Sequence, residues 1–521
     1  MSRINTNIPS VIAQANFTRT QKDLSLHLER LSTGLRINHG KDDPAGLIIS
    51  ERLRSTINAV DQGIKNSERA NSVIATGEAS LTEVNDLLNQ VKALIVESAN
   101  SGANSADERQ ANQLQIDSAI DSITRISNTA SFGGLKLLNG SLDYKLSAIH
   151  TSAVALARVN NASFIQSQSL QVQVDVIASA QVGGLYFHAP ATGNATLSAY
   201  TLEIRGSRGV EVISIASGQT MANIVQSVNN LTSLTGVRAR TMDDFSGATS
   251  GVVFESEDFG SNEFVSVRRL GGPSNTAANT WQTYKFIDTA AIPADVATGW
   301  AALVTANTIV TGDRDDGRDV SALVNGNLAN GSGLNVSINS GALGVGLLLT
   351  QAFATDPSAT PTGFYITGGG AQFQLGPDVN ALQQANIGIQ SVAASNLGGT
   401  LNGSGVLEFL SSLKSGQTND INSSFTRRDF TSASDILDSA VDEISKLRGR
   451  LGAFNKNVLD TNVRSLQASF ENLTASDSQI RDADFATETS KLTRAQILTN
   501  AGISTLSLAN QQSQNVLQLL G

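Results

Sequence analysis

The sequence predicts an α+β multidomain protein, in which long paired N- and C-terminal helices form a coiled-coil or bundle core and a β-rich outer region is inserted between them. Three observations predict this class. Residues 45–189 and 378–521 contain no proline, and a proline costs about 3 kcal/mol in a helix interior, so these runs permit long helices. Both ends carry apolar residues at alternating spacings of three and four. The middle instead shows short runs with period two between Gly-, Asn- and Ser-rich turns.

The first helical pattern ends in the segment LSTGLRINHGKDDPAG, residues 31–46. Its glycines fit the end of one helix and a connector, and two aspartates before a proline are typical of a helix start, with Asp as N-cap and Pro in the first turn. We therefore interpret the segment as a joint between two helices and not as an active site. The joint residues are Gly34, Gly40, Asp42, Asp43 and Pro44.

Apolar residues at heptad spacing define a predicted helix seam. A straight α-helix drifts about 20° per heptad relative to such a stripe, so the helix must wrap around a partner to keep the stripe buried. After Val458 the pattern slips by one residue and resumes at Leu459. The predicted assembly seam comprises Leu24, Leu28, Leu31, Leu35, Ile74, Leu81, Leu88, Ile95, Leu437, Ile444, Leu451 and Val458.

The last pattern of the chain mixes apolar and polar seam positions. Asn510 and Ser513 occupy the heptad positions between Leu506 and Leu517, and polar seam residues weaken a helix pair while fixing its register. Isolated helices of this kind are marginal in water, so we expect both chain ends to become ordered with partners. The apolar members of this stripe are Ile503, Leu506, Leu517 and Leu520.

The middle of the chain, about residues 143 to 430, predicts strands and at least one small α+β unit. Tyr200, Leu202 and Ile204 alternate with polar residues, and a second strand is predicted around Phe264, Val265 and Val267. Between the two strands lies a predicted helix that begins after Thr220 as N-cap and closes at Gly236. Its apolar face would hold Ile224, Val225, Val228 and Leu231.

The composition and the missing motifs argue against several classes of ligand and against enzyme activity. A net charge of −10 and a pI near 5.0 disfavour nucleic acid and anionic lipid as partners. There is no cysteine, no HExxH and no apolar run long enough for a cleaved signal peptide or a membrane span. We predict no metal, no cofactor and no enzyme activity. The acidic run DRDDGRD at 313–319 lacks the glutamate of an EF-hand, so we expect a solvated loop there.

Several motifs make the sequence closely similar to the bacterial flagellins. Near the N-terminus they are LSTGLRIN, KDDPAG, VKALIVESAN at 91–100 and FGGLKLLNG at 132–140. Near the C-terminus they are LGAFNKN from Leu451, SQIRDADFATE at 478–488, RAQIL at 494–498 and the final QNVLQLLG. Two groups of motifs in the same order make coincidence a poor explanation.

The resemblance implies a structural subunit that polymerises into the helical flagellar filament used for swimming motility. It implies three domains: 1–42 with 480–521 as a terminal coiled-coil core domain, 43–142 with 431–479 as a helical-bundle domain with a small β-hairpin, and 143–430 as a variable, surface-exposed, β-rich outer region of two or more domains. Head-to-tail contacts that do not close a ring generate such filaments.

The resemblance also implies partners and a location. The chain would be secreted without a cleaved signal, through the flagellar type III export apparatus, and would end in the extracellular filament. Its partners would be copies of itself, the filament cap and hook-associated proteins, and O-linked glycans on outer Ser/Thr residues, with no nucleic acid and no membrane insertion. An export chaperone would cover the C-terminal helix at Ile503, Leu506, Val516, Leu517 and Leu520.

Two alternatives remain open at this point. A hook-filament junction protein shares the terminal heptads and the export route, and the RAQIL and QNVLQLLG endings favour the filament subunit over it. The second alternative is a filament subunit whose outer region is an adhesive or enzymatic domain displayed on the polymer.

Overall fold

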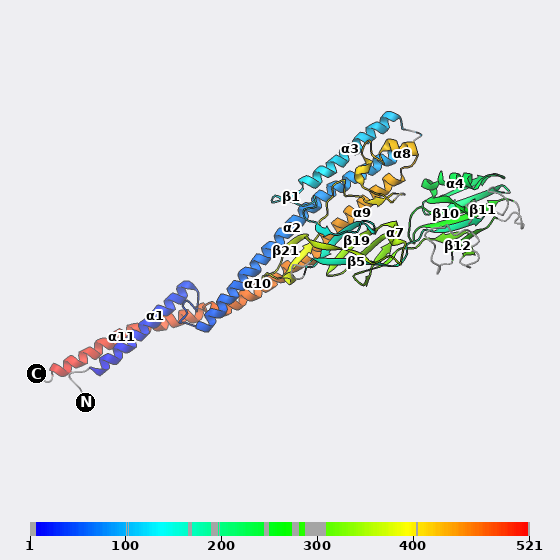
Figure 1. Cartoon of the computed structure of the whole chain (residues 1–521). Coiled ribbons are helices and arrows are strands. Elements are labelled where there is room, and N and C mark those ends of the chain that lie inside the picture. Colours follow the sequence, from blue (N-terminus) through cyan, green and yellow to red (C-terminus); the bar gives the residue numbers. More distant parts are fainter. Residues whose placement is uncertain are drawn as a thin grey trace. The chain divides into compact units, whose positions relative to one another are not determined.

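The structure is a computed structural model, and it describes residues 7–100, 102, 104–164, 169–188, 196, 198–243, 249–272, 281–286, 309–402 and 405–518. The chain divides into two compact units. The terminal unit comprises Met1–Ala70, Gln374–Gln384 and Lys456–Gly521, and the central unit comprises Asn71–Phe373 and Ala385–Asn455. Figure 1 gives the course of the chain through the elements of both units.

The terminal unit is helical. It contains α1 (Ile8–Thr33), the first part of α2 (Pro44–Ala99), α10 (Asp460–Arg481) and α11 (Phe485–Gln518). Helix α1 lies along α11 (Figure 1). The two are antiparallel, because Asn7 bonds to the carbonyl of Ala509 while His27 contacts Glu488. We call α1 and α11 together the terminal helix pair.

The helical part of the central unit is built on the predicted heptads. It contains the rest of α2, α3 (Ala106–Thr129), α8 (Ile421–Arg427), α9 (Thr431–Phe454), the 3₁₀ turn η2 (Leu410–Leu413) and the hairpin β1 (Ser131–Phe132) and β2 (Leu135–Lys136). The seam residues of α2 and α9 are buried, because a stripe at heptad spacing stays on one face of each helix. They are Ile74, Leu81, Leu88, Ile95, Leu437, Ile444 and Leu451.

A π-helical turn, η3 (Asn455–Leu459), joins α9 to α10. A π-helical turn adds about one residue to the turn it replaces, so the side chains that follow are shifted by one position on the helix face. This explains the one-residue slip in the heptads after Val458. Leu459 is fully buried whereas Val458 is only partly buried.

The first β core of the central unit lies between two antiparallel sheets of order β16-β15-β5-β20-β3 and β17-β18-β19-β4. Val172, Val345 and Phe364 are among its fully or almost fully buried residues. The elements are β3 (Tyr144–Ser147), β4 (Val154–Ala162), β5 (Leu170–Ala178), β15 (Ser321–Val324), β16 (Asn327–Leu328), β17 (Asn330–Ser332), β18 (Asn335–Asn339), β19 (Leu343–Leu349), α7 (Gln351–Ala354) and β20 (Thr362–Gly369).

The second β core lies between sheets of order β13-β12-β6-β10-β9 and β14-β11-β7-β8, with α4 packed on it. Its elements are β6 (Gly184–His188), β7 (Tyr200–Arg205), β8 (Val210–Ile215), α4 (Met221–Asn229), α5 (Thr232–Thr235), β9 (Val237–Asp243), β10 (Thr249–Ser256), β11 (Phe264–Gly271), β12 (Thr283–Phe286), β13 (Ile309–Thr311) and β14 (Arg314–Asp316). Gln181 and Arg318 pair backbone to backbone where the chain enters and leaves this core.

The strands predicted at 200–205 and around 264–267 are confirmed as β7 and β11, with every second residue buried. The helix capped by Thr220 is also confirmed, because the Thr220 side chain accepts a bond from the backbone N–H of Asn223. The predicted single helix to Gly236 is wrong in one respect. It stops at Asn229, and α5 follows as a separate turn that Gly236 closes in a left-handed conformation.

The prediction of a solvated loop at 313–319 is wrong for two of its carboxylates, although Asp313 and Asp316 are exposed. Asp315 lies in β14, is buried, and accepts a hydrogen bond of 2.8 Å from the backbone N–H of Gly184. Asp319 accepts a bond of 2.7 Å from the backbone N–H of Gly333 and further bonds from Ser261. The carboxylates replace water with backbone donors from distant segments, so two of them serve the fold.

The remaining short elements connect the β cores to the helices. They are β21 (Ala371–Gln374), the 3₁₀ turn η1 (Ala381–Gln383), β22 (Gln384–Ile387), β23 (Thr400–Leu401) and β24 (Leu407–Glu408). β21 pairs with β22, and β23 pairs with β24.

Candidate assembly surface

The contact line within the terminal helix pair includes several small residues. Ala13 on α1 and Ala495 and Ala509 on α11 are buried. Gly502 faces Phe17 so closely that a Cβ atom there would lie 3.3 Å from Phe17 Cδ2. Leu492 of α11 is also buried, and Leu24, Leu31 and Leu506 are partly buried, so the contact line combines small side chains with larger apolar ones.

Large apolar side chains of the same two helices remain exposed. Each is between 48% and 66% exposed, whereas monomeric soluble proteins rarely leave many such side chains together in contact with water. Apolar area of this extent indicates a surface that a further protein covers. The residues are Ile8, Val11, Ile12, Leu28, Phe485, Ile497, Leu498, Ile503 and Leu508.

A buried carboxylate fixes the register of the pair. The Glu488 side chain is 5% exposed, and it lies 2.5 Å from His27 Nδ1 and 3.5 Å from Arg30 of α1. Lys491 of α11 adds a third contact at 3.3 Å. Burial raises the pKa of Glu488, but hydrogen bonds from His27 and Lys491 outweigh this effect and leave the pKa below its ordinary value.

Polar contacts also join the N-terminal end of α1 to α11. Asn7 Nδ2 donates to the carbonyl of Ala509 at 3.0 Å, and Ser10 Oγ lies 2.7 Å from Asn510 Oδ1. The polar seam residue Asn510 therefore contacts α1, although its side chain is largely exposed. Together with Glu488, these bonds favour a single alignment of α1 on α11.

The predicted joint lies between α1 and α2. Gly34 ends α1 in a left-handed conformation with φ +72°. Asp42 accepts bonds from the backbone N–H groups of His39 and Asn38, which lower its pKa despite some burial. Asp43 accepts a bond of 2.9 Å from Gly46 N–H, as an N-cap does, and α2 begins at Pro44.

The joint is tied to the segment before α11. Arg36 N–H donates to the carbonyl of Arg481 at 2.7 Å, and Ala483 N–H donates to the carbonyl of Gly34 at 2.9 Å. Leu35 and Asp482 form the backbone bridge between these two bonds. The segment that follows α1 and the segment that follows α10 therefore lie side by side.

Replacing Gly46 by alanine is expected to weaken the start of α2. A Cβ atom there would lie 2.4 Å from Asp43 Oδ2 and 2.8 Å from Ile37 Cδ1, so the capping carboxylate must move. Loss of an N-cap costs about 1 kcal/mol, and crowding against the buried Ile37 adds to it. Urea unfolding of the unassembled subunit measures the change. Gly40→Ala is the control, because its Cβ atom would meet only Leu47 at 3.7 Å. Equal stability of the two variants would contradict the assignment.

The predicted seam residues fall into two groups. Those of α2 and α9 are buried within one chain, and Val458 is partly buried. Leu24 and Leu31 are partly buried on α1, Leu28 is exposed, and Leu35 lies beyond the end of α1. Leu506 is partly buried and Ile503 exposed, whereas Leu520 and the side chains of Val516 and Leu517 lie outside the described residues. Their roles in assembly stay predictions.

Sequence reasoning missed Val11, Ile12, Ile497, Leu498 and Leu508 as candidate site residues. They belong to no stripe at heptad spacing, so a search for one seam passes over them. The signal that could have found them is a second apolar face on a helix that already has one, which is typical of helices with two sets of neighbours.

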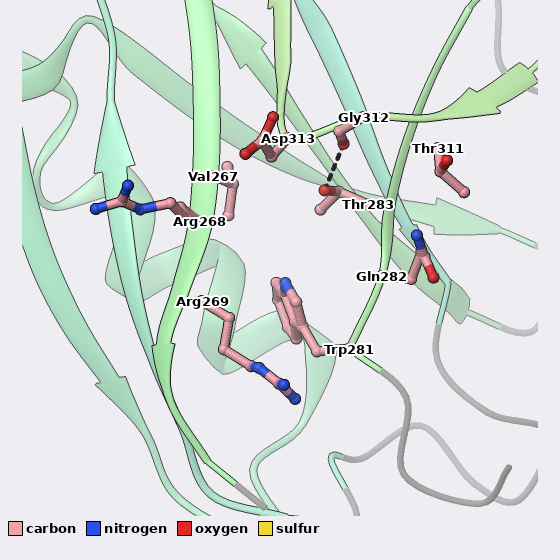
Figure 2. Close-up of a pocket in the computed structure, with 9 residues that line it drawn as sticks. All are labelled: Val267, Arg268, Arg269, Trp281, Gln282, Thr283, Thr311, Gly312 and Asp313. Atoms are coloured by element: carbon pink, nitrogen blue, oxygen red, sulfur yellow. Dashed lines mark hydrogen bonds between the residues drawn. The ribbon is translucent and has the colours of Figure 1, made fainter. Parts of the chain in front are cut away.

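A separate shallow pocket lies in the second β core (Figure 2). Its buried Trp281 stacks on Phe187 with ring centroids 3.8 Å apart, and Thr283 Oγ1 donates to the carbonyl of Gly312 at 2.7 Å. In Figure 2, Arg268 points away from Trp281. The nine described lining residues include no His, Cys, Ser or Lys.

Within the described residues, no group of three or more His, Asp or Glu side chains is placed to hold a metal ion. No described helix is both long enough and apolar enough to cross a membrane.

Comparison with known proteins assigns the two helical ends. The family model for the bacterial flagellin N-terminal helical region matches residues 4–143, and the model for the bacterial flagellin C-terminal helical region matches residues 434–520. The chain is 30% identical to the B-type flagellin of Pseudomonas aeruginosa, 29% to the flagellin of Escherichia coli strain K12 and 28% to the flagellin of Salmonella rubislaw. Each alignment covers 99% of both chains.

A chain with paired terminal helices, an uncovered apolar surface on them and β cores inserted between them is a self-assembling structural protein. The comparisons specify the assembly: the chain belongs to the bacterial flagellin family. It is a subunit of the helical flagellar filament used for swimming motility, and matches along the full chain favour this function over that of a hook-filament junction protein. The family is structural and forms the extracellular flagellar filament.

Proposed function

We propose that subunits polymerise by covering the exposed apolar side chains of the terminal helix pair with those of neighbouring copies. The observation that carries this proposal is the exposure of nine large apolar side chains on the two helices of this pair. Burying one such side chain fully contributes about 1.5–3 kcal/mol, so even partial burial of several favours association. Contacts between unlike surfaces of identical chains extend into a helical array when they do not close a ring.

The same surface supports the proposed export chaperone. Before assembly, Ile503 and Leu508 of α11 are 53% and 66% exposed, and a chaperone that covers α11 would prevent early polymerisation. Filament cap and hook-associated proteins would use this surface at the ends of the polymer. Secretion through the type III apparatus and O-glycans on outer Ser/Thr residues complete the proposal, which assigns no catalytic step to the chain.

The proposed domain division stays 1–42 with 480–521, 43–142 with 431–479, and 143–430. The backbone bridge between Leu35 and Asp482 supports placing a boundary at the joint, because α1 and α10 both end next to this bridge. We propose that Gly34, Gly40, Asp42, Asp43 and Pro44 act as this inter-domain joint. The two separate β cores support more than one outer domain.

Polar substitution of the exposed face tests the proposed mode of assembly. The double variant Ile497→Ser with Leu508→Ser changes side chains that are 63% and 66% exposed, so the subunit should fold normally but pellet poorly as filaments. The measurements are circular dichroism of the subunit and sedimentation of the polymer. Leu328→Ser is the control, since Leu328 is 68% exposed but lies on β16, at the edge of a sheet of the central unit. Normal filaments from the double variant would refute the proposal.

A further inference from the structure

The loop between β21 and β22, residues 375–383, carries the two most exposed large apolar side chains of the described residues. Val379 is 87% exposed and Leu382 is 96% exposed. Most loop tips are polar, because apolar side chains gain nothing in water. Two such side chains three residues apart therefore need an explanation from contacts outside this loop.

Side-chain hydrogen bonds hold the 375–383 loop in one conformation. Gln383 Oε1 accepts a bond of 2.6 Å from the backbone N–H of Asp378. Asn380 Oδ1 accepts bonds of 3.1 and 3.0 Å from the backbone N–H groups of Leu382 and Gln383. Gln374 Nε2 donates to the carbonyl of Asp378 at 2.8 Å. A surface that is fixed before binding loses little entropy when it docks.

The loop is anchored to the helices of the terminal unit. The carbonyl of Leu375 accepts a bond of 2.9 Å from Asn462 Nδ2 of α10. On α2, a Cβ atom at Gly63 would lie 3.1 Å from the same carbonyl, so the loop backbone rests directly on that helix. The 375–383 loop is thus a rigid projection on the unit that also holds the terminal helix pair.

We propose that the 375–383 loop docks Val379 and Leu382 onto a second copy of this chain in the filament. This inference rests on the chain being a filament subunit. In a helical array every copy presents the same surface to identical neighbours, and this loop belongs to the same compact unit as the terminal helix pair proposed to polymerise. Asp378 is the loop's one charged residue, and its carboxylate is already bonded to Gln383 Nε2 at 3.1 Å. An apolar tip without a free charge fits a protein surface.

Thiol labelling tests the docking directly, because the chain has no cysteine. Val379→Cys introduces a single thiol, and its reaction rate with a small maleimide is measured in subunits and in filaments of the same variant. The proposal expects fast labelling in subunits and labelling at least tenfold slower in filaments. Leu328→Cys, at a residue that is 68% exposed, is the matched control and should label equally fast in both.

Two results would overturn the inference. Equal labelling of the Val379→Cys thiol in subunits and filaments would mean that no copy covers the loop. Slow labelling already in subunits would mean that another segment of the same chain covers it.

A second variant measures the contribution of the contact. Val379→Ser with Leu382→Ser is expected to raise the critical concentration for polymerisation about tenfold, without changing the circular dichroism of the subunit. An unchanged critical concentration would contradict the docking and leave the filament function intact. Failure of the unaltered chain to pellet under the same conditions would instead contradict polymerisation itself.

Discussion

Deleting residues 482–521 is expected to abolish filament formation and to leave the central unit folded. The deletion removes α11, so α1 loses its partner and its buried contacts with Glu488. A lone helix of 26 residues is marginal in water, and the exposed surface of the pair disappears with it. The buried residues of α9 and of both β cores lie outside the deleted segment. Electron microscopy and sedimentation measure filaments, and thermal unfolding measures the central unit.

A larger deletion elsewhere is the matched control. Gln181 and Arg318 pair through backbone bonds of 2.8 and 2.9 Å, so the second β core enters and leaves at one point. Replacing 182–317 by Asn-Gly would connect this antiparallel pair with a two-residue turn. This variant should still form filaments, although it lacks more residues. Filaments from the chain without 482–521 would contradict the proposed role of the terminal helix pair.

Glu488→Ala is expected to weaken the terminal helix pair by about 3 kcal/mol, because it removes a buried carboxylate that contacts the partly buried His27 and Arg30 of α1. Hydrogen exchange of the α11 amides in the unassembled subunit measures the change, and about 100-fold faster exchange is expected. Glu51→Ala is the control. Glu51 is 55% exposed and bonds to Arg481 at 3.0 Å, and such exposed pairs contribute at most about 1 kcal/mol.

The same carboxylate makes the pair sensitive to acid. The pKa of Glu488 in the folded subunit lies below its ordinary value of 4.5, so the unfolded chain binds its proton more readily than the folded chain. The stabilisation is therefore complete above about pH 4.5 and is lost as the pH falls through the lowered pKa. Glu488→Gln should remove this part of the pH dependence. Identical acid profiles for the variant and the unaltered chain would contradict the assignment.

The helical ends could be predicted from the sequence because the spacing of apolar residues identifies one face of a helix, and that face is buried in these helices. Leu88 and Leu447 recur with their neighbours at heptad spacing, and both are fully buried. The outer region was harder to predict because its structure depends on contacts between residues that are far apart in the sequence. β19, LGVGLLL, has no polar residue between its buried Leu343, Val345, Leu347 and Leu349, so the sequence marks no solvent face, and Asp315 is satisfied by Gly184, 131 residues earlier.

The candidate site was predicted in part for the same reason. Ile503 lies on the exposed surface, and Asn510 contacts α1. Periodicity cannot distinguish which of two apolar faces a single chain covers and which it leaves for another copy, so Ile497 and Leu508 were missed. The 375–383 loop gave no signal, since its conformation depends on Gln383, Asn380 and the distant Asn462.

The π-helical turn η3 sets the angular phase between the stretches that precede and follow it. Each residue of an α-helix rotates the direction of its side chain by about 100°, so removing one residue from 455–459 while restoring an unbroken α-helix would preserve the phase of α10. Removing one residue a few turns further along would instead turn the apolar stripe to the wrong side. Within the continuous helix from α9 to α10, tolerance of single-residue deletions should therefore be confined to this one turn.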